Sequence, residues 1–339
     1  MDQRKNWPDY AKGIAIILVV LCHTANGITN AGIAVAPKFW AAVCEICYIF
    51  MVPVFFFLSG YFSQKSGKTP RSRLIHIGAT VLFPFLVWGT IQHATIVMTG
   101  SANVRTTWGD LPLSMIKGGP MQFWFLYTLC LLLLLDWFWR KLAVSNGLRL
   151  LIALAVTQIL PLWVDYKSGA LYRPLTSYIY FEVGCFLASV SLPTFTRPQR
   201  FALGMAGIVG LVALYLAGCK YATPLRPGPA FLGIAACIAF STLIPNTKEM
   251  QWLRKLGRFS LQIYCLHLFF AAGVRIVMVR LGYTEYYGHV LLGFLSAMVG
   301  SVLVAAIDEK WFGWWFRFPT RSRPAEKVLS EKAHPMGTA

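Results

Sequence analysis

Apolar residues in this chain come in blocks of about twenty, the length that a helix needs to cross the hydrocarbon core of a bilayer. The 339 residues are 57% hydrophobic and only 13% charged, and windows such as 126–135 contain no charged side chain. A soluble protein of this length would carry more surface charge and would show amphipathic periods. The sequence therefore predicts an all-α, polytopic integral membrane protein with about ten transmembrane helices.

Ten such spans divide the chain. The longest connection between them, 99–121, is rich in Gly, Thr and Pro, so we expect it to lie outside the membrane and to face substrate. Residues 1–308 would form the membrane domain, and 309–339 would form an aromatic and basic interfacial anchor with a loose cytoplasmic tail. The predicted spans are 11–29, 41–63, 74–98, 122–140, 148–165, 174–191, 201–218, 229–245, 258–281 and 288–308.

Positive charge is distributed unequally between the two sides of this topology. The side that holds the N-terminus carries 21 Lys and Arg residues and the opposite side carries 8, while Lys12 and Arg275 lie within spans. The positive-inside rule then predicts that both termini are cytoplasmic. The same rule accounts for the formal net charge of +18, so the bilayer is an expected partner and nucleic acid is not.

The eight cysteines fall inside apolar segments or at their edges. We interpret them as small packing residues, because no small secreted framework surrounds them. Cys44 and Cys47 form a C-x-x-C pair without a second pair, so no metal site is predicted.

A cation and an imidazole interrupt the first apolar block. Lys12 and His23 are eleven residues apart, about 1100° of helix rotation and within roughly 20° of three full turns, so both lie on one face. They are separated by about 16 Å along the axis, which places Lys12 near one membrane edge and His23 near mid-depth. Ionisable groups at that depth are rare and must face other helices or a wet cavity. We therefore expect His23 to be functional.

The ninth span repeats this pattern. Ser260, Tyr264 and His267 fall at i, i+4 and i+7, so they share a helix face, and His267 is also expected near mid-depth. Glu182 in the sixth span is a third deep ionisable group, and a carboxylate there needs a cation, a histidine or water. The sequence leaves open whether Glu182 orients a histidine or forms a structural ion pair.

A basic connection precedes the third span. It contains Arg71 and Arg73, with Lys65 and Lys68 close by. Topology alone is a sufficient explanation of these charges. The functional alternative is a clamp for an anionic group such as a nucleotide phosphate, which guanidinium forks suit well.

Small residues and prolines mark the second and third spans. Ser59 and Gly60 lie in an aromatic run, where they would let a backbone or a bound cofactor approach closely, although helix packing predicts the same. Pro53 and Pro84 would kink their helices and open a cavity.

Five motifs, taken in their order along the chain, are specific together. They are Lys12-x10-His23, Phe57-Leu58-Ser59-Gly60-Tyr61-Phe62, the loop with Arg71 and Arg73, Phe123-Trp124-Phe125-Leu126-Tyr127, and Ser260-x3-Tyr264-x2-His267. Over roughly residues 7–308 they resemble the membrane acyltransferase family 3, in the branch named for fucose 4-O-acetylase. The resemblance implies a multi-pass inner-membrane enzyme that moves an acyl group, usually acetyl, from acyl-CoA to a hydroxyl of a carbohydrate or glycan. Acyl-CoA is then a co-substrate, and no permanently bound cofactor or metal is expected.

The resemblance also assigns residues. It implies that His23 is the essential imidazole, that Lys12 stands where many members have arginine, and that Arg71 and Arg73 are the basic pair near the donor. Two features depart from the family pattern. Lysine at position 12 lacks a bidentate fork, and the Arg-x-Arg spacing is tighter than the usual Arg-x-x-Arg.

Thioester chemistry suggests how these residues would act. A sugar hydroxyl is a poor nucleophile, so a base must take its proton during attack on the acyl carbonyl, and a neutral His23 suits this role. His267 or Tyr264 would donate a hydrogen bond to the oxyanion in a cavity that excludes water. A covalent acyl-imidazole on His23 is the alternative. The donor would enter from the cytoplasmic side, where Lys12, Arg71 and Arg73 match its phosphates, with Ser59 and Gly60 beside it.

A secondary transporter or flippase is the competing functional class, since many spans with buried charges also describe such carriers. Against it, residues 170–308 contain no second copy of the Lys-x10-His stripe or of the Ser-Gly run. A receptor without chemistry would leave the two polar stripes unexplained.

Overall fold

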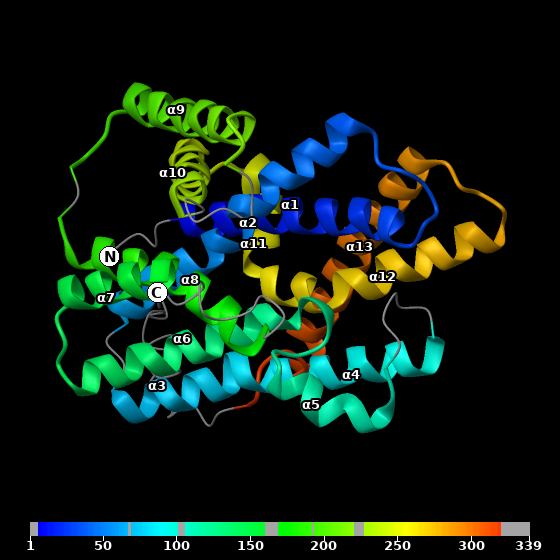
Figure 1. Cartoon of the computed structure of the whole chain (residues 1–339), viewed down its shortest axis with the longest axis horizontal. Helices are drawn as coiled ribbons and strands as arrows, with labels where there is room; N and C mark the ends of the chain where they lie inside the picture. Colours follow the sequence, from blue (N-terminus) through cyan, green and yellow to red (C-terminus); the bar gives the residue numbers. More distant parts are fainter. Residues whose placement is uncertain are drawn as a thin grey trace, which may run out of the picture.

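A computed structural model describes residues 6–66, 69–100, 106–159, 169–191, 193–219 and 227–319. All regular structure in these ranges is helical, as predicted (Figure 1). Seven helical stretches in the described part of the chain are long and apolar enough to cross a membrane, and two shorter apolar helices accompany them. The prediction of an all-α, multi-pass membrane protein is thereby confirmed.

Each predicted span corresponds to a helix. The third is built from three consecutive segments, and two shorter helices, α5 Leu111–Ile116 and α11 Gln251–Arg258, lie in connections. The helices are α1 Trp7–Asn30, α2 Lys38–Lys65, α3 Pro70–Ile77 with η1 Gly78–Leu82 and α4 Phe83–Thr99, α6 Trp124–Lys141, α7 Asn146–Ile159, α8 Gly169–Ser189, α9 Arg197–Leu216, α10 Pro227–Leu243, α12 Ser260–Arg280 and α13 Tyr286–Ile307.

Helix α1 lies at the centre of the bundle. It contacts α2, α10, α11, α12 and α13 (Figure 1), and Ala11, Ala15 and Ala25 on it are fully buried. A helix that carries a cation and an imidazole has to turn them toward protein or a cavity rather than lipid. The position of α1 meets that requirement, while α9 packs against α10 at the edge of the bundle (Figure 1).

Glycines allow two pairs of helices to approach closely. A Cβ on Gly60 of α2 would overlap the carbonyl oxygen of Phe181 in α8, and a Cβ on Gly184 of α8 would overlap that of Phe57. Gly257 of α11 meets the backbone of Asp9 in α1 in the same way. Of the two interpretations of Gly60 that the sequence allowed, its surroundings therefore favour helix packing.

The third span contains a π-helical segment next to a proline. Pro84 has no backbone N–H with which to bond the carbonyl of Thr80, and η1 Gly78–Leu82 widens at this point. The widened turn brings Thr80 and Val81 to the wall of an internal cavity that Pro53 also lines. This agrees with the expectation that the prolines open space inside the bundle.

The connection 99–121 is described at 99–100 and 106–121, and the second of these parts is folded. Thr107 and Asp110 form a capping box at a short 3-10 turn, and α5 follows. His93 in α4 lies 2.8 Å from the carbonyl oxygen of Thr107, and Met115 packs beside Gly89. The connection thus folds back over the end of α4.

The segment after α13 packs against the bundle. The indole N–H of Trp88 donates to the carbonyl oxygen of Trp315 over 2.9 Å, and the rings of Trp88 and Phe316 stack 4.8 Å apart. Trp311 and Trp314 are exposed. The predicted interfacial anchor is therefore divided between buried and exposed aromatics, and the predicted tail from residue 320 onward lies outside the described residues.

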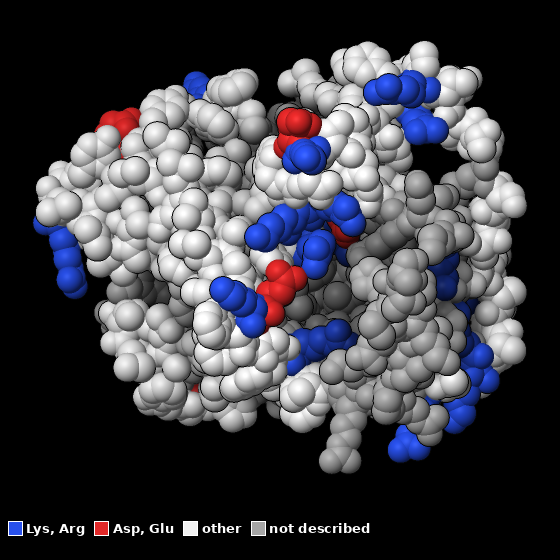
Figure 2. All heavy atoms as spheres, turned by 180° about the vertical axis from the view of Figure 1, so that it is seen from behind, with Lys and Arg blue, Asp and Glu red and all other residues white. Residues whose placement is uncertain are grey.

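Charged side chains are unevenly spread over the surface. On the face in Figure 2, several Lys and Arg lie around a hollowed region near the middle and others lie along the edges, while wide areas of the described surface carry no charge. Broad uncharged surface is what contact with lipid requires.

Candidate active site

The two histidines of the polar stripes lie against each other. Nδ1 of His23 in α1 is 3.0 Å from Nε2 of His267 in α12. The ring planes are within 12° of parallel, with centroids 5.2 Å apart. His267 is buried, whereas His23 is partly exposed to internal space. The two histidines that the sequence places at similar depth are thus in direct contact.

The backbone of α12 fixes how the protons are arranged on this pair. Nδ1 of His267 lies 3.0 Å from the carbonyl oxygen of Ile263 and 2.8 Å from that of Tyr264. Carbonyl oxygens only accept, so we assign the proton of neutral His267 to Nδ1 and the lone pair to Nε2. His23 then donates from Nδ1, which leaves the lone pair on its own Nε2. This is the tautomer that a histidine acting as a base through Nε2 needs.

His23 borders a central cavity of about 730 Å³. Lys12, His23, Ser59 and Tyr264 all line it, so the structure brings together four residues that the sequence singled out. The Lys12 ammonium lies 5.9 Å from the centroid of the Phe62 ring. The hydroxyl of Tyr264 donates to the carbonyl oxygen of Gln122.

His23 also borders a second space, here called the Arg275 cavity, of about 430 Å³. The two cavities share five lining residues, His23, Asn30, Tyr48, Gln122 and Trp124. The Arg275 cavity extends toward the C-terminal ends of α1 and α12. These ends lie on the side of the bundle opposite the basic α2–α3 connection. His23 therefore stands where two internal spaces meet.

A third space, the Arg73 cavity of about 340 Å³, adjoins the central cavity on the other side. Lys12 and Ser59 line both. Arg73 itself is shared with a fourth, the Arg140 cavity of about 460 Å³, which Lys141 and Trp137 also line. The series of cavities thus runs from a basic end, past Lys12, to His23.

Arg71 and Arg73 do not act as a pair in this structure. Both lie on α3, which begins at Pro70, and residues two apart on a helix point about 200° away from each other. Arg73 turns inward, with 12% of its side chain exposed, and donates to the carbonyl oxygens of Ser63 and Ser66. Arg71 is exposed.

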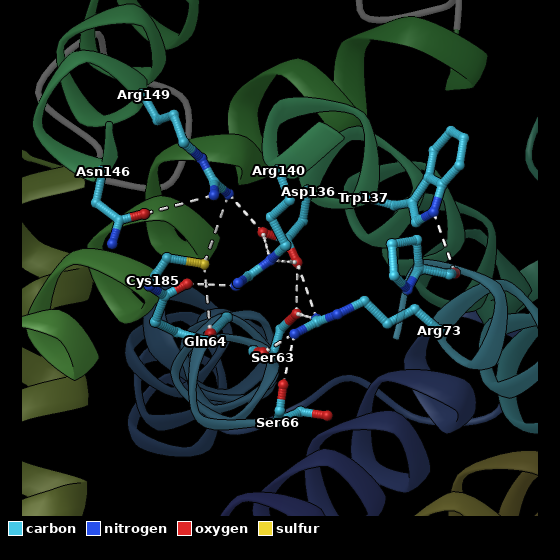
Figure 3. A network of polar contacts seen from close by, with 12 residues as sticks. Ser63, Gln64, Ser66, Arg73, Asp136, Trp137, Arg140, Asn146, Arg149 and Cys185 are labelled. Carbon is cyan, nitrogen blue, oxygen red and sulfur yellow. Dashed lines mark hydrogen bonds and ion pairs between the residues drawn. The ribbon is translucent and has the colours of Figure 1, made fainter. Parts of the chain in front are cut away.

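Charged residues from four helices form a buried network, and Figure 3 shows the part of it around Asp136, Arg140 and Arg149. Asp136 of α6 accepts from Nη2 of Arg149 in α7 over 2.7 Å and from Nε of Arg140 over 3.0 Å. The same Nη2 donates to Glu182 of α8 over 2.9 Å. Nη1 of Arg73 in α3 lies 3.7 Å from Asp136. The network ties these helices together near the basic end of the cavities.

This network answers the question that the sequence left open for Glu182. Its carboxylate pairs with Arg149, and both side chains are almost completely buried. The histidines, by contrast, bond to each other and to the backbone of α12. The contacts of Glu182 therefore favour the structural ion pair.

Several residues near the site carry no signal in the sequence that would single them out. Asp136 and Arg149 lie near helix ends, where hydropathy gives no signal of their burial. Arg173 looked like a loop residue but lies in α8, where its guanidinium is 4.2 Å from the Trp124 ring centroid and lines the central cavity. Gln122 follows the long connection, and its amide atoms Oε1 and Nε2 are buried without a hydrogen-bond partner in the described structure.

Replacing Arg149 with Met tests the network. It would leave Asp136 and Glu182 as buried carboxylates without their shared cation, so we expect unfolding to become easier by about 3–5 kcal/mol. Arg140→Gln is the matched control, because Arg140 is 24% exposed and its loss leaves Arg149 in place. Thermal unfolding of the purified protein in detergent measures both. Unfolding of Arg149→Met at the wild-type temperature would show that the network does not stabilise the bundle.

No resident metal centre is evident in the described ranges, which contain no group of three or more His, Cys, Asp or Glu placed to hold an ion. Neither the search of curated proteins nor that of solved structures returned a match for the chain. A family model for an acyltransferase domain matches residues 5–307, nearly the whole of the chain. The contact of two histidines inside a multi-pass bundle thus lies within that domain, and the chain belongs to acyltransferase family 3.

Proposed function

We propose that the protein is a membrane O-acyltransferase that moves an acetyl group from acetyl-CoA to a hydroxyl of a carbohydrate or glycan, as in the fucose 4-O-acetylase branch. One observation carries the proposal. His23 is held by His267 in a base-competent tautomer at the point where the central and Arg275 cavities meet. A base in that position can serve a donor that arrives from one cavity and an acceptor that arrives from the other.

The basic end of the cavities suits the donor. Arg73, Arg140 and Lys141 line the Arg140 cavity, and Trp137 there offers an aromatic face. Guanidinium groups bind phosphate well, and the ring suits a purine base. With cytoplasmic termini in the inner membrane, as the charge distribution predicts, this end faces the cytoplasmic acyl-CoA pool. The pantetheine arm would then run past Lys12 and Ser59 toward His23.

The reaction follows from these positions. The acceptor hydroxyl loses its proton to Nε2 of His23 as its oxygen attacks the thioester carbonyl, giving a tetrahedral oxyanion. Collapse of this intermediate breaks the carbon–sulfur bond, forms the ester, and returns the proton from His23 to the departing thiolate of CoA. Proton and electrons balance without a further reactant. Direct transfer needs no acyl-imidazole on His23, which remains the competing scheme.

Gln122 is the oxyanion donor that the hydrogen bonding favours. The N–H of His267 is directed to backbone carbonyls, and the hydroxyl of Tyr264 is directed to the carbonyl of Gln122. The Gln122 amide N–H groups are buried at the boundary of both cavities and have no partner in the described structure. We therefore propose positioning roles for His267 and Tyr264, with Gln122 as the donor to the oxyanion.

A transporter would also use connected cavities, so the test must separate transport from chemistry. Purified protein in detergent is supplied with acetyl-CoA and simple methyl glycosides, and free CoA thiol and sugar ester are measured by absorbance and mass spectrometry. We expect one ester formed for each thiol released. If no glycoside leads to consumption of acetyl-CoA and the protein takes glycoside up into proteoliposomes, the protein is a carrier and the proposal of an enzyme is wrong.

The two arginines of α3 give a further prediction for the donor site. Arg73→Gln should raise the KM for acetyl-CoA by about tenfold or more, the scale of one lost charge-assisted hydrogen bond. Arg71→Gln is the matched control on the exposed face of α3 and should change this KM little. Steady-state kinetics with varied acetyl-CoA decides between them. If the two substitutions raise this KM equally, Arg71 and Arg73 both bind the donor, as the sequence predicts.

A further inference from the structure

The Arg275 cavity contains polar side chains that have no partner in the described structure. Oε1 of Gln92, both amide atoms of Gln122 and Nδ1 of His289 are buried without a hydrogen bond. All three residues are more than nine-tenths buried, and all line this cavity. Buried polar groups in a bundle normally find partners, because an unsatisfied group costs free energy. Three in one cavity indicate a ligand that supplies the missing hydrogen bonds.

The chemistry of these groups specifies hydroxyls. Nε2 of His289 lies 2.8 Å from the carbonyl oxygen of Tyr283, so its proton is assigned to Nε2 and Nδ1 presents a lone pair. An amide oxygen on Gln92 likewise accepts, whereas Gln122 offers both donor and acceptor atoms. A hydroxyl both donates and accepts, so a polyol satisfies this mixed set.

One cation lies among them. Of the described residues that line the Arg275 cavity, Arg275 is the only Lys or Arg, and none is acidic. Its Nη1 donates to the carbonyl oxygen of Gly27 over 2.8 Å. That bond satisfies one N–H but leaves the charge without a counter-ion in the wall of the cavity. A cation within a membrane-spanning helix is costly and is stabilised by anionic groups or by backbone carbonyls, so an anionic ligand in the cavity would pair favourably with Arg275.

We infer that the Arg275 cavity is the acceptor subsite and that it selects a hydroxyl-rich acceptor bearing an anionic group, carboxylate or phosphate, which pairs with Arg275. This rests on the proposed function in that the cavity meets the donor path at His23. Arg275 follows His267 by eight residues on α12, about 12 Å along the axis. Nη1 of Arg275 reaches back to Gly27, which follows His23 by four residues and about 6 Å along α1, so the anion would bind on the sugar unit that carries the reacting hydroxyl.

The test compares three acceptors with matched skeletons: methyl glucoside, methyl glucuronoside and glucose 6-phosphate. At saturating acetyl-CoA, the wild-type protein should show kcat/KM about 10- to 100-fold higher for an anionic acceptor than for methyl glucoside, the scale of a charge-assisted contact. Preference for the uronate indicates a carboxylate and preference for the sugar phosphate indicates a phosphate, and either supports the inference. Equal kcat/KM for all three would overturn it.

Arg275→Gln assigns the effect to this residue. It should remove the preference for the anionic acceptor and leave the KM for acetyl-CoA unchanged, while Arg275→Lys should keep part of the preference. Arg280→Gln is the matched control, because Arg280 is exposed at the end of the same helix. An Arg275→Gln protein that retains the full preference would contradict the inference.

A binding measurement separates this inference from the proposed function. Without acetyl-CoA, methyl glucuronoside or glucose 6-phosphate should raise the thermal unfolding temperature of the wild-type protein and not that of Arg275→Gln. If the wild-type protein transfers no acetyl group to any acceptor but shows this shift, the acyltransferase proposal fails and the anion subsite stands. If neither anion shifts the unfolding temperature more than methyl glucoside does, the subsite fails.

Discussion

His23→Ala is expected to lower kcat by about 10²–10⁴-fold, the usual contribution of a general base. His23→Gln should be no better, because an amide can hydrogen-bond to the acceptor but cannot take its proton. KM for acetyl-CoA should change little, since the proposed site for the donor phosphates is at the opposite end of the cavities from His23. The measurement is CoA release and ester formation by the purified variants at saturating substrates.

The matched control for these variants is His93→Gln. His93 is also a buried histidine, but it lies 2.8 Å from the carbonyl oxygen of Thr107 and does not line the central or Arg275 cavities. The His93→Gln protein should keep a near-wild-type kcat, which would show that loss of a buried histidine does not by itself lower activity. A folded His23→Gln protein with near-normal transfer, beside an inactive His267→Gln protein, would show that the roles of the two histidines are reversed.

His267→Leu is expected to cost about 10²–10⁴-fold in kcat, as does loss of the group that fixes the tautomer in a Ser-His-Asp triad. Leucine cannot accept the proton that His23 offers from Nδ1 over 3.0 Å. The His23 ring would then be free to turn or to change tautomer, and Nε2 would no longer present its lone pair to the acceptor.

His267→Gln distinguishes positioning from mere packing. Its amide oxygen can accept from His23 and its amide N–H can donate to the carbonyls of Ile263 and Tyr264, so a loss of only about 10–100-fold is expected. Both variants should retain the wild-type KM for acetyl-CoA. Equal kcat losses for Leu and Gln at position 267, with lowered thermal stability in both, would indicate that His267 only fills space.

The helices could be predicted because a segment that crosses lipid must consist of about twenty mostly apolar residues, and such blocks are visible in the sequence. Every predicted span, from 11–29 to 288–308, overlaps a helix in the described residues, since long apolar runs have few alternatives in a bilayer. The shared depth of His23 and His267 followed from helix rise. Their contact could not be predicted, because it depends on how α1 and α12 pack, which a rotational pattern on one helix does not fix.

The charged site residues show where sequence reasoning ends. Arg71 and Arg73 looked like a loop pair, but α3 begins at Pro70 and turns them to different faces. The charge count includes Arg149 only as a topology signal and does not include Asp136, although five helices meet around their ion pair and its neighbours. Positions near the end of a span give no hydropathy signal that separates a surface charge from a buried network.

Sealed proteoliposomes test whether donor and acceptor reach His23 from opposite cavities. Acetyl-CoA with a ¹³C-labelled acetyl group is placed outside, and a mixture of methyl glucoside and methyl glucuronoside is sealed inside. We expect ¹³C-acetyl ester on the enclosed sugar, free CoA outside, and neither product with His23→Gln. Labelled ester that forms only when donor and acceptor share one side, or release of unmodified sugar without CoA formation, would contradict it.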